Sequence, residues 1–472
     1  MNFQISLLLL GALYLSAPGP LRAQRYAIRN VHVIPMNREI VLTNQTVLID
    51  NGLISHIGPA GGRRIGRGYV SVDGKDKFLM PGLMDMHVHF FQEQGEFRNT
   101  CREELKVMLA NGLTTVRIMA GHPSYLAARD SVRRSRWTGP DLYVASPQLV
   151  GRWAWATQFK NYEITDTPEK AVSAVRQFRE QGYDAIKLTF MLRRDMYDAI
   201  VRTAREENMP VVGHVGPDVK LPRALESGEQ IEHMDEFIDM LLPDTSYNHG
   251  MSVSDMNIWR PEAWATVPFL DENRIPELAR RVKQSGIYVS PTNFFFIACF
   301  GETLTPEQIK KRPDYGFIPS YIQAGRWTIR RRYEAMLPSE EKRRRYVDLR
   351  KKMVQALWQE GVPLMAGSDT PEWFLVSGFT LHDELKAFVD AGLTPFAALQ
   401  TATVNPAAYL HILDQKGTVE VGKKADLILL DNNPLMDIRY SRSIDGVFRA
   451  GRWYDKNAVT EMLETARTVL SQ

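Results

Sequence analysis

Eight short apolar runs alternate with helix-like segments through the middle of this chain, and this alternation constrains the fold more than any other feature. The helix-like segments include PEKAVSAVRQFREQG and MYDAIVRTAREEN, whose apolar residues recur at helical spacing. The strand-like runs are, in chain order, LMDMHVH, TTVRIMAG, DLYVASPQL, YDAIKLTF, PVVGHV, QIEHMDE, IYVSPTNFF and PLMAGSDT. Eight strand–helix units predict an α/β fold in which residues 81–412 form a (β/α)₈ barrel, with its chemistry at the carboxyl ends of the strands.

Both ends of the chain carry β-type runs separated by turns. Residues 24–80 contain AIRNVHVIPM, TVLIDNGLISHIG and YVSVDGKDKFLM, and the DNG at 50–52 and the DG at 73–74 are typical of hairpin turns. The pattern returns in GTVEVGKKADLILLDNNP and DGVFRAGRWY. We therefore expect residues 24–80 and 413–472 to form one small β domain, followed by a C-terminal helix, with the barrel inserted between its two halves.

Residues 1–23 are typical of a secretory signal peptide. An apolar stretch runs from Ile5 to about Ala17, Pro-Gly-Pro follows, and the small Ala23 stands at the expected cleavage site. An uncleaved membrane anchor is the alternative, but the stretch is short for a span. No later segment has the roughly 18 uninterrupted apolar residues of a membrane helix. We expect a protein that is exported, either periplasmic or secreted, with no stable membrane insertion after signal cleavage.

Charge and cysteine content exclude several classes of protein. The net charge is only +3, which argues against a nucleic-acid binder with a broad basic surface. The two cysteines, Cys101 and Cys299, are too few for a disulfide framework or a Cys-ligated zinc site. A single disulfide is one alternative, and two unpaired buried thiols are the favoured one. Any metal must therefore be held by histidines and carboxylates.

Two histidines end the first barrel strand. Because residues i and i+2 of a strand point to the same face, we expect His87 and His89 both to point into the barrel. A lone histidine there would usually be a buried structural residue, whereas two in register favour metal ligation. His214, His233 and Asp369 end three further strands. Such nitrogen and oxygen donors, meeting at one rim, suit Zn²⁺ and tolerate Mn²⁺, Co²⁺ or Fe²⁺.

Lys187 lies at the end of the fourth strand-like run. One alternative is an ordinary strand-end lysine that reaches solvent. The other is a buried lysine close to the metal site, where neighbouring cations favour loss of its proton. The neutral amine could then take up CO₂ and become a carbamate that bridges two metals. The spacing alone leaves both alternatives open.

The motifs HVH after PGLMD, IK, GHV, IEH and GSD, in this order, resemble the amidohydrolase superfamily. The segment LHDELKAFVDAGLTPFAALQTATVNPAAYL, followed by KGTVEVGKKADLILLDNNPL, resembles its imidazolonepropionase-related and prolidase-like branch. The resemblance extends over residues 27–455. It implies a distorted (β/α)₈ TIM barrel together with a β-sandwich made from both chain ends.

The resemblance also implies a binuclear centre of two divalent metal ions, with zinc favoured. His87 and His89 would hold the more buried ion with Asp369, and His214 and His233 would hold the other. A carboxylated Lys187 and a hydroxide would bridge the two ions.

This centre implies hydrolysis of a small-molecule substrate. Two divalent ions lower the pKa of a bridging water and polarise the scissile carbonyl, and Asp369 would act both as a ligand and as the proton shuttle to the leaving group. The expected reaction is cleavage of an amide in a peptide-like or N-acyl amino acid substrate. Hydrolysis of a lactone, ester or phosphotriester is the alternative reaction. A non-catalytic metal- or ligand-binding protein on the same scaffold is the alternative class, and the sequence is compatible with a homo-oligomer.

Three further residues are candidates for substrate contacts. Arg117, at the end of the second strand, could clamp a substrate carboxylate or form a structural ion pair. His122 follows in the same loop and could line the pocket or face solvent. Asn293, which ends IYVSPTN, is another candidate at the rim.

Residues 296–360 exceed what one strand–helix connection needs. Between Arg326 and Lys352 stand 11 basic and 4 acidic side chains. A solvated pair of helices broken at Pro338 is the favoured interpretation. A lid that draws anionic substrates towards the metals is the alternative.

Overall fold

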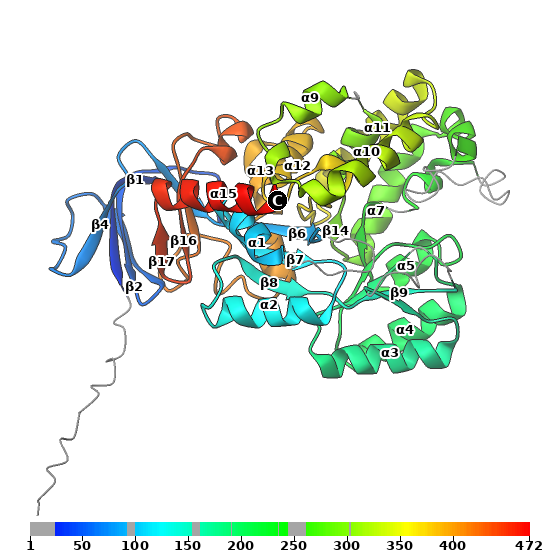
Figure 1. Ribbon diagram of the computed structural model, residues 1–472, viewed down its shortest axis with the longest axis horizontal. Helices are drawn as coiled ribbons and strands as arrows, with labels where there is room; N and C mark the ends of the chain where they lie inside the picture. The colour runs from blue at the N-terminus through cyan, green and yellow to red at the C-terminus, as the bar shows by residue number, and fades with distance from the viewer. Residues whose placement is uncertain are drawn as a thin grey trace, which may run out of the picture.

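Strands from both chain ends form one sheet beside a helix-rich body (Figure 1). The computed structural model describes residues 24–91, 100–152, 161–189, 191–234, 236–243, 261–301 and 304–472. The expected signal peptide lies outside these ranges and stays a prediction. Within them, every helix is too short or too polar to cross a membrane.

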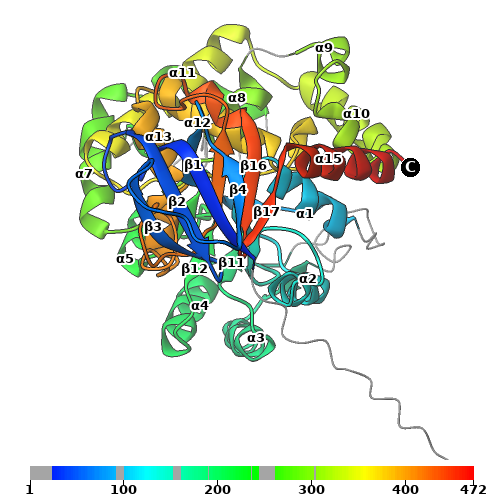
Figure 2. The same cartoon turned by 90° about the vertical axis from the view of Figure 1, so that its left-hand side faces the viewer.

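The sheet made by the chain ends has eight strands, in the order β17-β16-β15-β5-β1-β2-β3, with β4 also paired to β1. Its strands are β1 (Arg25–Val33), β2 (Leu42–Asp50), β3 (Leu53–Pro59), β4 (Tyr69–Asp73), β5 (Phe78–Pro81), β15 (Leu427–Leu430), β16 (Ile444–Arg449) and β17 (Arg452–Tyr454). The two chain ends meet where β5 pairs with β15 in antiparallel fashion. Figure 2 shows the N-terminal strands in blue and the C-terminal strands in red within this sheet. In the described ranges these strands form a single sheet, so the expected β-sandwich is not confirmed.

The two turn signals of the N-terminal half have different outcomes. Asn51 and Gly52 connect β2 to β3 with φ angles of 52° and 77°, and two positive φ angles are what a type I′ hairpin turn requires. The hairpin at 50–52 is therefore confirmed. The hairpin expected at 73–74 is wrong, because the flanking strands β4 and β5 both run parallel to β1.

The expected barrel strands lie in two parallel sheets. One has the order β6-β7-β8 and the other β10-β9-β11-β12-β13-β14. Their strands are β6 (Leu83–Val88), β7 (Leu113–Ile118), β8 (Asp141–Val144), β9 (Gln148–Val150), β10 (Tyr162–Ile164), β11 (Ile186–Leu188), β12 (Val211–Gly213), β13 (Gln230–Glu232) and β14 (Val289–Ser290). A single parallel bridge between Ala145 and Ala185 connects the two sheets, and two more connect Val289 to Leu364 and Val88 to Thr370, on the segment that carries Asp369. The barrel prediction is thus confirmed in part, because the fold is α/β but the described ladders do not close into one continuous sheet.

Helices surround the sheets, and several of them bury apolar faces against the parallel strands. They are α1 (Cys101–Ala110), α2 (Pro123–Arg133), α3 (Pro168–Gln181), α4 (Arg194–Glu206), α5 (Leu221–Ser227), α7 (Ile275–Ser285), α8 (Asn293–Phe300), α9 (Pro306–Lys310), α10 (Ser320–Glu334), α11 (Glu340–Gln359), α12 (Phe379–Asp390), α13 (Pro395–Thr401), α14 (Val404–Tyr409) and α15 (Lys456–Leu470). Helix α3 shows why the segments end where they do. Thr167 caps its first turn by accepting a hydrogen bond from Lys170 N, and Gly182 ends it with a φ of 82°.

The basic segment forms α10 and α11, and the chain breaks between them around Pro338 as expected. Helix α10 has no fully buried residue, whereas α11 buries one face that includes Tyr346, Arg350 and Met353. Both cysteines are buried and unpaired, which confirms the favoured alternative for them.

Candidate metal centre

His87, His89 and Asp369 meet where β6 ends. The backbone places them, because Asp369 N donates to His87 O at 2.8 Å and His89 N donates to Thr370 O at 2.7 Å. Asp369 has a φ of 50°, an uncommon value for a residue with a side chain. The three side chains therefore come together because the segment that carries Asp369 runs beside the end of β6.

Three side-chain atoms form a nearly equilateral triangle. His87 Nε2 lies 3.2 Å from His89 Nε2 and 3.3 Å from Asp369 Oδ1, and His89 Nε2 lies 3.4 Å from the same oxygen. Zn²⁺ binds imidazole nitrogens and carboxylate oxygens at about 2.0–2.2 Å, so two ligand atoms at the tetrahedral angle lie about 3.4 Å apart. The donor set and its spacing therefore fit one divalent ion.

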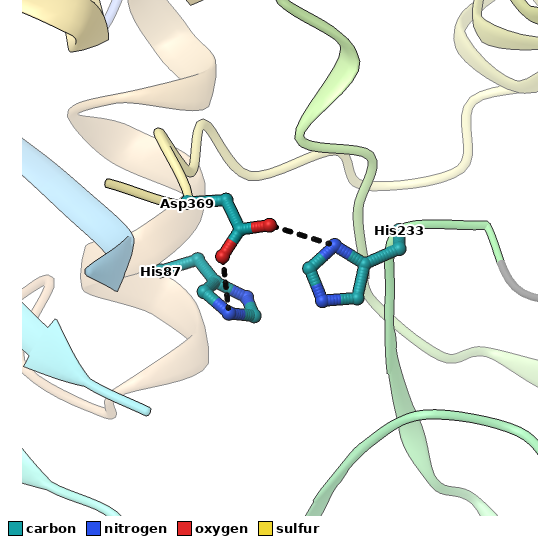
Figure 3. Close-up of side chains that lie close together, drawn as sticks. All are labelled: His87, His233 and Asp369. Carbon is teal, nitrogen blue, oxygen red and sulfur yellow. Dashed lines mark ion pairs between the residues drawn. The ribbon is translucent and has the colours of Figure 1, made fainter. Parts of the chain in front are cut away.

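Asp369 also faces His233, which stacks on His214. Its Oδ2 lies 3.7 Å from His233 Nδ1, and the His233 ring stacks on the His214 ring with centroids 4.5 Å apart. Figure 3 shows Asp369 between His87 and His233, with one carboxylate oxygen towards each. Ligand atoms of His87, His233 and Asp369 all lie within 4.8 Å of one another. The carboxylate therefore lies between His87 and His89 on one side and His233 on the other.

The backbone that carries His233 is also constrained. His233 has a φ of 62° and Thr292 a φ of 44°, and Thr292 Oγ1 lies 2.7 Å from His233 Nδ1. His233 N donates to Ser290 O at 2.8 Å, which fixes the end of β13 to the end of β14. The segment that carries Asp369 packs as tightly, since a Cβ on Gly367 would lie 2.7 Å from His87 Cβ. Glycine is needed at that position.

Lys187 lies on β11 with no exposed surface. Burial and, less strongly, the positive charge of Lys187 lower the pKa values of His87 and His233, and the same charge opposes the rise that burial causes in the pKa of Asp369. Lys187 is fully buried, so the alternative of a lysine reaching solvent is wrong.

Burial favours the neutral form of His87 and His233, which is the form that binds metals. Burial lowers the pKa of His87 well below its usual value, and the charge of Lys187 adds to this effect. Burial also lowers the pKa of His233, helped by neighbouring His214. Burial raises the pKa of Asp369, while its hydrogen bond with His89 opposes that rise. Neutral imidazoles beside a carboxylate are what a divalent cation requires.

The model of the Amidohydrolase family matches residues 78–454 of this chain. The chain belongs to the amidohydrolase family. It is 23% identical to an adenine deaminase of Bradyrhizobium sp. over 201 residues, which cover 41% of this chain and 32% of that protein. It is 27% identical to a dihydroorotase of Halalkalibacterium halodurans over 188 residues, which cover 40% of this chain and 41% of that protein. The chain thus matches less than half the length of these curated relatives.

Solved structures share the fold over most of the chain. A bottromycin amidohydrolase gives a TM-score of 0.72 at 21% identity, covering 95% of this chain and 91% of that chain. A Xaa-Pro dipeptidase with bound methionine gives a TM-score of 0.66 at 21% identity, covering 91% and 100%. At such identities the likeness shows that this family member has their fold.

The three candidate substrate residues of this amidohydrolase family member have other partners. Arg117 is 2% exposed and forms an ion pair with Glu232, which favours the structural ion pair over the substrate clamp. His122 caps α2 by accepting a hydrogen bond from Ser124 N. Asn293 is fully buried at the start of α8, where its N–H donates to Glu384 Oε1 at 2.8 Å. Substrate contacts by these residues stay a prediction.

Two buried acids beside the centre were not predicted from the sequence. Glu232 Oε2 lies 2.6 Å from His87 Nδ1. Asp85 Oδ1 accepts hydrogen bonds from His87 N and Ser368 N, and burial raises the pKa of Asp85 to about 7. A signal for both was present, because an acid within a buried strand needs a partner. Asp85 also shares a strand face with His87, two residues away.

Proposed function

We propose that this chain is a metal-dependent amidohydrolase that cleaves an amide bond in a peptide-like or N-acyl amino acid substrate. The observation that carries the proposal is the position of Asp369, with Oδ1 facing His87 and His89 and Oδ2 facing His233. A carboxylate so placed can serve both as a metal ligand and as an acid–base group. Family membership and the fold shared with a dipeptidase and an amidohydrolase support amide hydrolysis.

The metal centre of this proposal holds two divalent ions, with zinc favoured by the nitrogen and oxygen donors. His87, His89 and Asp369 would hold one ion, and His214 and His233 the other. Lys187 would contribute as a carbamate, for which its complete burial close to the histidines is the support. When bound, the ions would polarise the scissile carbonyl and lower the pKa of a water molecule.

Asp369 would move the proton. Its two carboxylate oxygens face the ligand sets on either side, so one of them can take up and release a proton near the attacking water and the leaving group. It would accept a proton from the attacking water and then deliver it to the leaving nitrogen. An unprotonated nitrogen is a poor leaving group, so bond cleavage needs this proton. Asp369 would therefore serve both halves of the reaction.

Metal analysis combined with a substrate panel tests the proposal. We expect two ions per chain, turnover of dipeptides or N-acyl amino acids, and loss of turnover on chelation. Asp369→Asn should abolish turnover, whereas Asp195→Asn, at an exposed carboxylate, should not. Turnover of lactones or phosphotriesters instead would replace the amide assignment. A metal-loaded wild-type protein that is inert on the whole panel would favour the alternative class, a non-catalytic metal- or ligand-binding protein.

Export is a separate part of the proposal and rests on the sequence of residues 1–23. Protein recovered from the periplasm or the medium should begin at Gln24 when its N-terminus is sequenced. Protein that retains Met1 and stays in the cytoplasm would contradict export.

A further inference from the structure

Arg117, Glu232 and His87 form a buried chain of polar contacts. It ends at His87 Nδ1, the ring nitrogen on the side away from Asp369. His87 Nδ1 lies 2.6 Å from Glu232 Oε2, and Glu232 Oε1 lies 2.5 Å from Arg117 Nη2. The exposed fractions are 1% for His87, 0% for Glu232 and 2% for Arg117. All three groups are therefore shielded from water.

The ion pair sets the direction of the hydrogen bond. A carboxylate paired with a guanidinium can only accept hydrogen bonds, so His87 Nδ1 must be the donor to Glu232. In the neutral imidazole the other nitrogen, Nε2, then carries the lone pair. That lone pair points to the triangle formed with His89 and Asp369. Glu232 thus selects the tautomer that can bind a cation there.

Arg117 holds this carboxylate in place from a third strand. Its Nε donates to Met86 O at 2.7 Å, beside His87 in β6. Its Nη1 donates to Gln230 Oε1 at 2.6 Å, two residues before Glu232 in β13. A side chain on β7 therefore fixes β6 and β13 relative to each other, and its donors are directed at protein acceptors.

We propose that Arg117, Glu232 and His87 form a positioning relay that sets the tautomer, ring orientation and basicity of His87, and so raises the affinity of the His87–His89–Asp369 site for a divalent cation. Carboxylates that accept a hydrogen bond from a metal-binding imidazole have this effect in general. Neither Glu232 nor Arg117 touches the substrate in this arrangement. The inference rests on the metal centre of the proposed function.

Cobalt binding by the full chain tests the relay. Wild type and variants are stripped with a chelator and reloaded with Co²⁺, and affinity is measured by competition with a chromogenic chelator. Glu232→Gln should weaken the affinity by about 10- to 100-fold and shift the visible absorption bands of bound Co²⁺. The matched control is Glu229→Gln, next to the same strand, where a buried carboxylate accepts from Tyr197 Oη at 2.8 Å. It should leave affinity and bands unchanged.

A second variant separates positioning from folding. Glu232→Gln alone leaves the Arg117 charge buried without its partner and could unfold the chain. The double variant Glu232→Gln with Arg117→Gln leaves no unpaired buried charge, so it should melt at a higher temperature than Glu232→Gln alone while its Co²⁺ affinity stays low. Wild-type affinity in either folded Glu232 variant, or an equal loss in Glu229→Gln, would overturn the relay. Failure of both Glu232 variants to fold would also overturn it, because the pair would then act in folding alone.

The same data separate the relay from the proposed function. If wild type binds Co²⁺ and the Glu232 variants bind it weakly, but no substrate is turned over, the relay stands and the hydrolase assignment fails. If wild type hydrolyses an amide and the Glu232 variants bind Co²⁺ as tightly, the hydrolase assignment stands and the relay fails.

Discussion

Arg350 of α11 donates a hydrogen bond to the backbone carbonyl of His233, with Nη2 and O 3.0 Å apart. The same nitrogen donates to Pro291 O at 3.0 Å, and the guanidinium lies 3.7 Å from the centroid of the Phe296 ring. Arg350 is fully buried although it belongs to the most basic segment of the chain. Arg350 therefore connects the loops that follow β13 and β14. The first of these loops starts at the candidate metal ligand His233.

Arg350→Ala should destabilise the protein and weaken metal binding. The substitution leaves the carbonyl groups of His233 and Pro291 buried without this donor, which should lower the free energy of unfolding by about 3 kcal/mol. It also frees the backbone of His233, so cobalt affinity should fall. Denaturant unfolding and the cobalt competition assay measure the two effects.

The control lies on the same helix. Arg344 is 74% exposed in its side chain and pairs with Glu340 one turn away, so Arg344→Ala should change the unfolding free energy by about 0.5 kcal/mol or less. Equal stability of the two variants would show that the buried contacts of Arg350 contribute nothing.

The two histidines His89 and His122 should respond differently to alanine. His89→Ala removes one corner of the ligand triangle, so we expect bound zinc to fall when metal content is measured after dialysis. His122→Ala removes the cap of α2, which should lower stability by about 1 kcal/mol and leave metal content unchanged. Loss of metal in His122→Ala but not in His89→Ala would reverse the assignment of the centre.

The convergence of the candidate ligands was predictable because it follows from strand geometry. His87 and His89 share a strand face, and the carboxyl ends of parallel strands meet at one rim, where Asp369 also lies. The partners of those ligands were not predictable in this way. Glu232 reaches Arg117 and His87 across the interior, and such contacts depend on side chains of strands that are distant in sequence.

The basic segment shows a second limit of prediction from the sequence. A count of charges cannot distinguish the buried Arg350 from the exposed Arg344, since both add one positive charge. Helical periodicity does distinguish them, because Arg350 lies four residues after Tyr346 and three before Met353, on the buried face of α11. Asn293 lies on a different element than expected, because the chain turns from β14 into α8 within a few residues and the expected strand end is the first residue of a helix.

Lys416 should be essential for joining the end sheet to the barrel. Its Nζ lies 2.6 Å from Asp426 Oδ2, next to β15, and 2.6 Å from Asp141 Oδ2 on β8. Lys416→Met leaves the buried Asp426 with Arg449, 3.6 Å away, as its remaining cation and should lower stability by about 3 kcal/mol. Lys386→Met, which breaks an exposed pair with Asp390, should cost about 0.5 kcal/mol or less. Thermal unfolding of both variants measures the difference. Equal melting temperatures would contradict the role of Lys416 in joining the end sheet to the barrel.

Glu104 should make the protein less stable as the pH rises from about 5 to 8. Its buried carboxyl accepts from Phe91 N at 3.0 Å and Thr100 Oγ1 at 2.7 Å, and burial raises its pKa from 4.5 to about 8. Between these values the unfolded chain has released the proton that the folded chain keeps. Raising the pH therefore favours unfolding, by up to about 1.4 kcal/mol per pH unit for this one group.

Glu104→Gln isolates that contribution, because glutamine keeps the acceptor oxygen and has no proton to release. The melting temperature of the variant relative to wild type should rise steadily across the same pH range. Glu461→Gln, at an exposed position on α15, should run parallel to wild type. A constant difference between Glu104→Gln and wild type from pH 5 to 8 would mean that Glu104 releases its proton equally readily in the folded and unfolded chains.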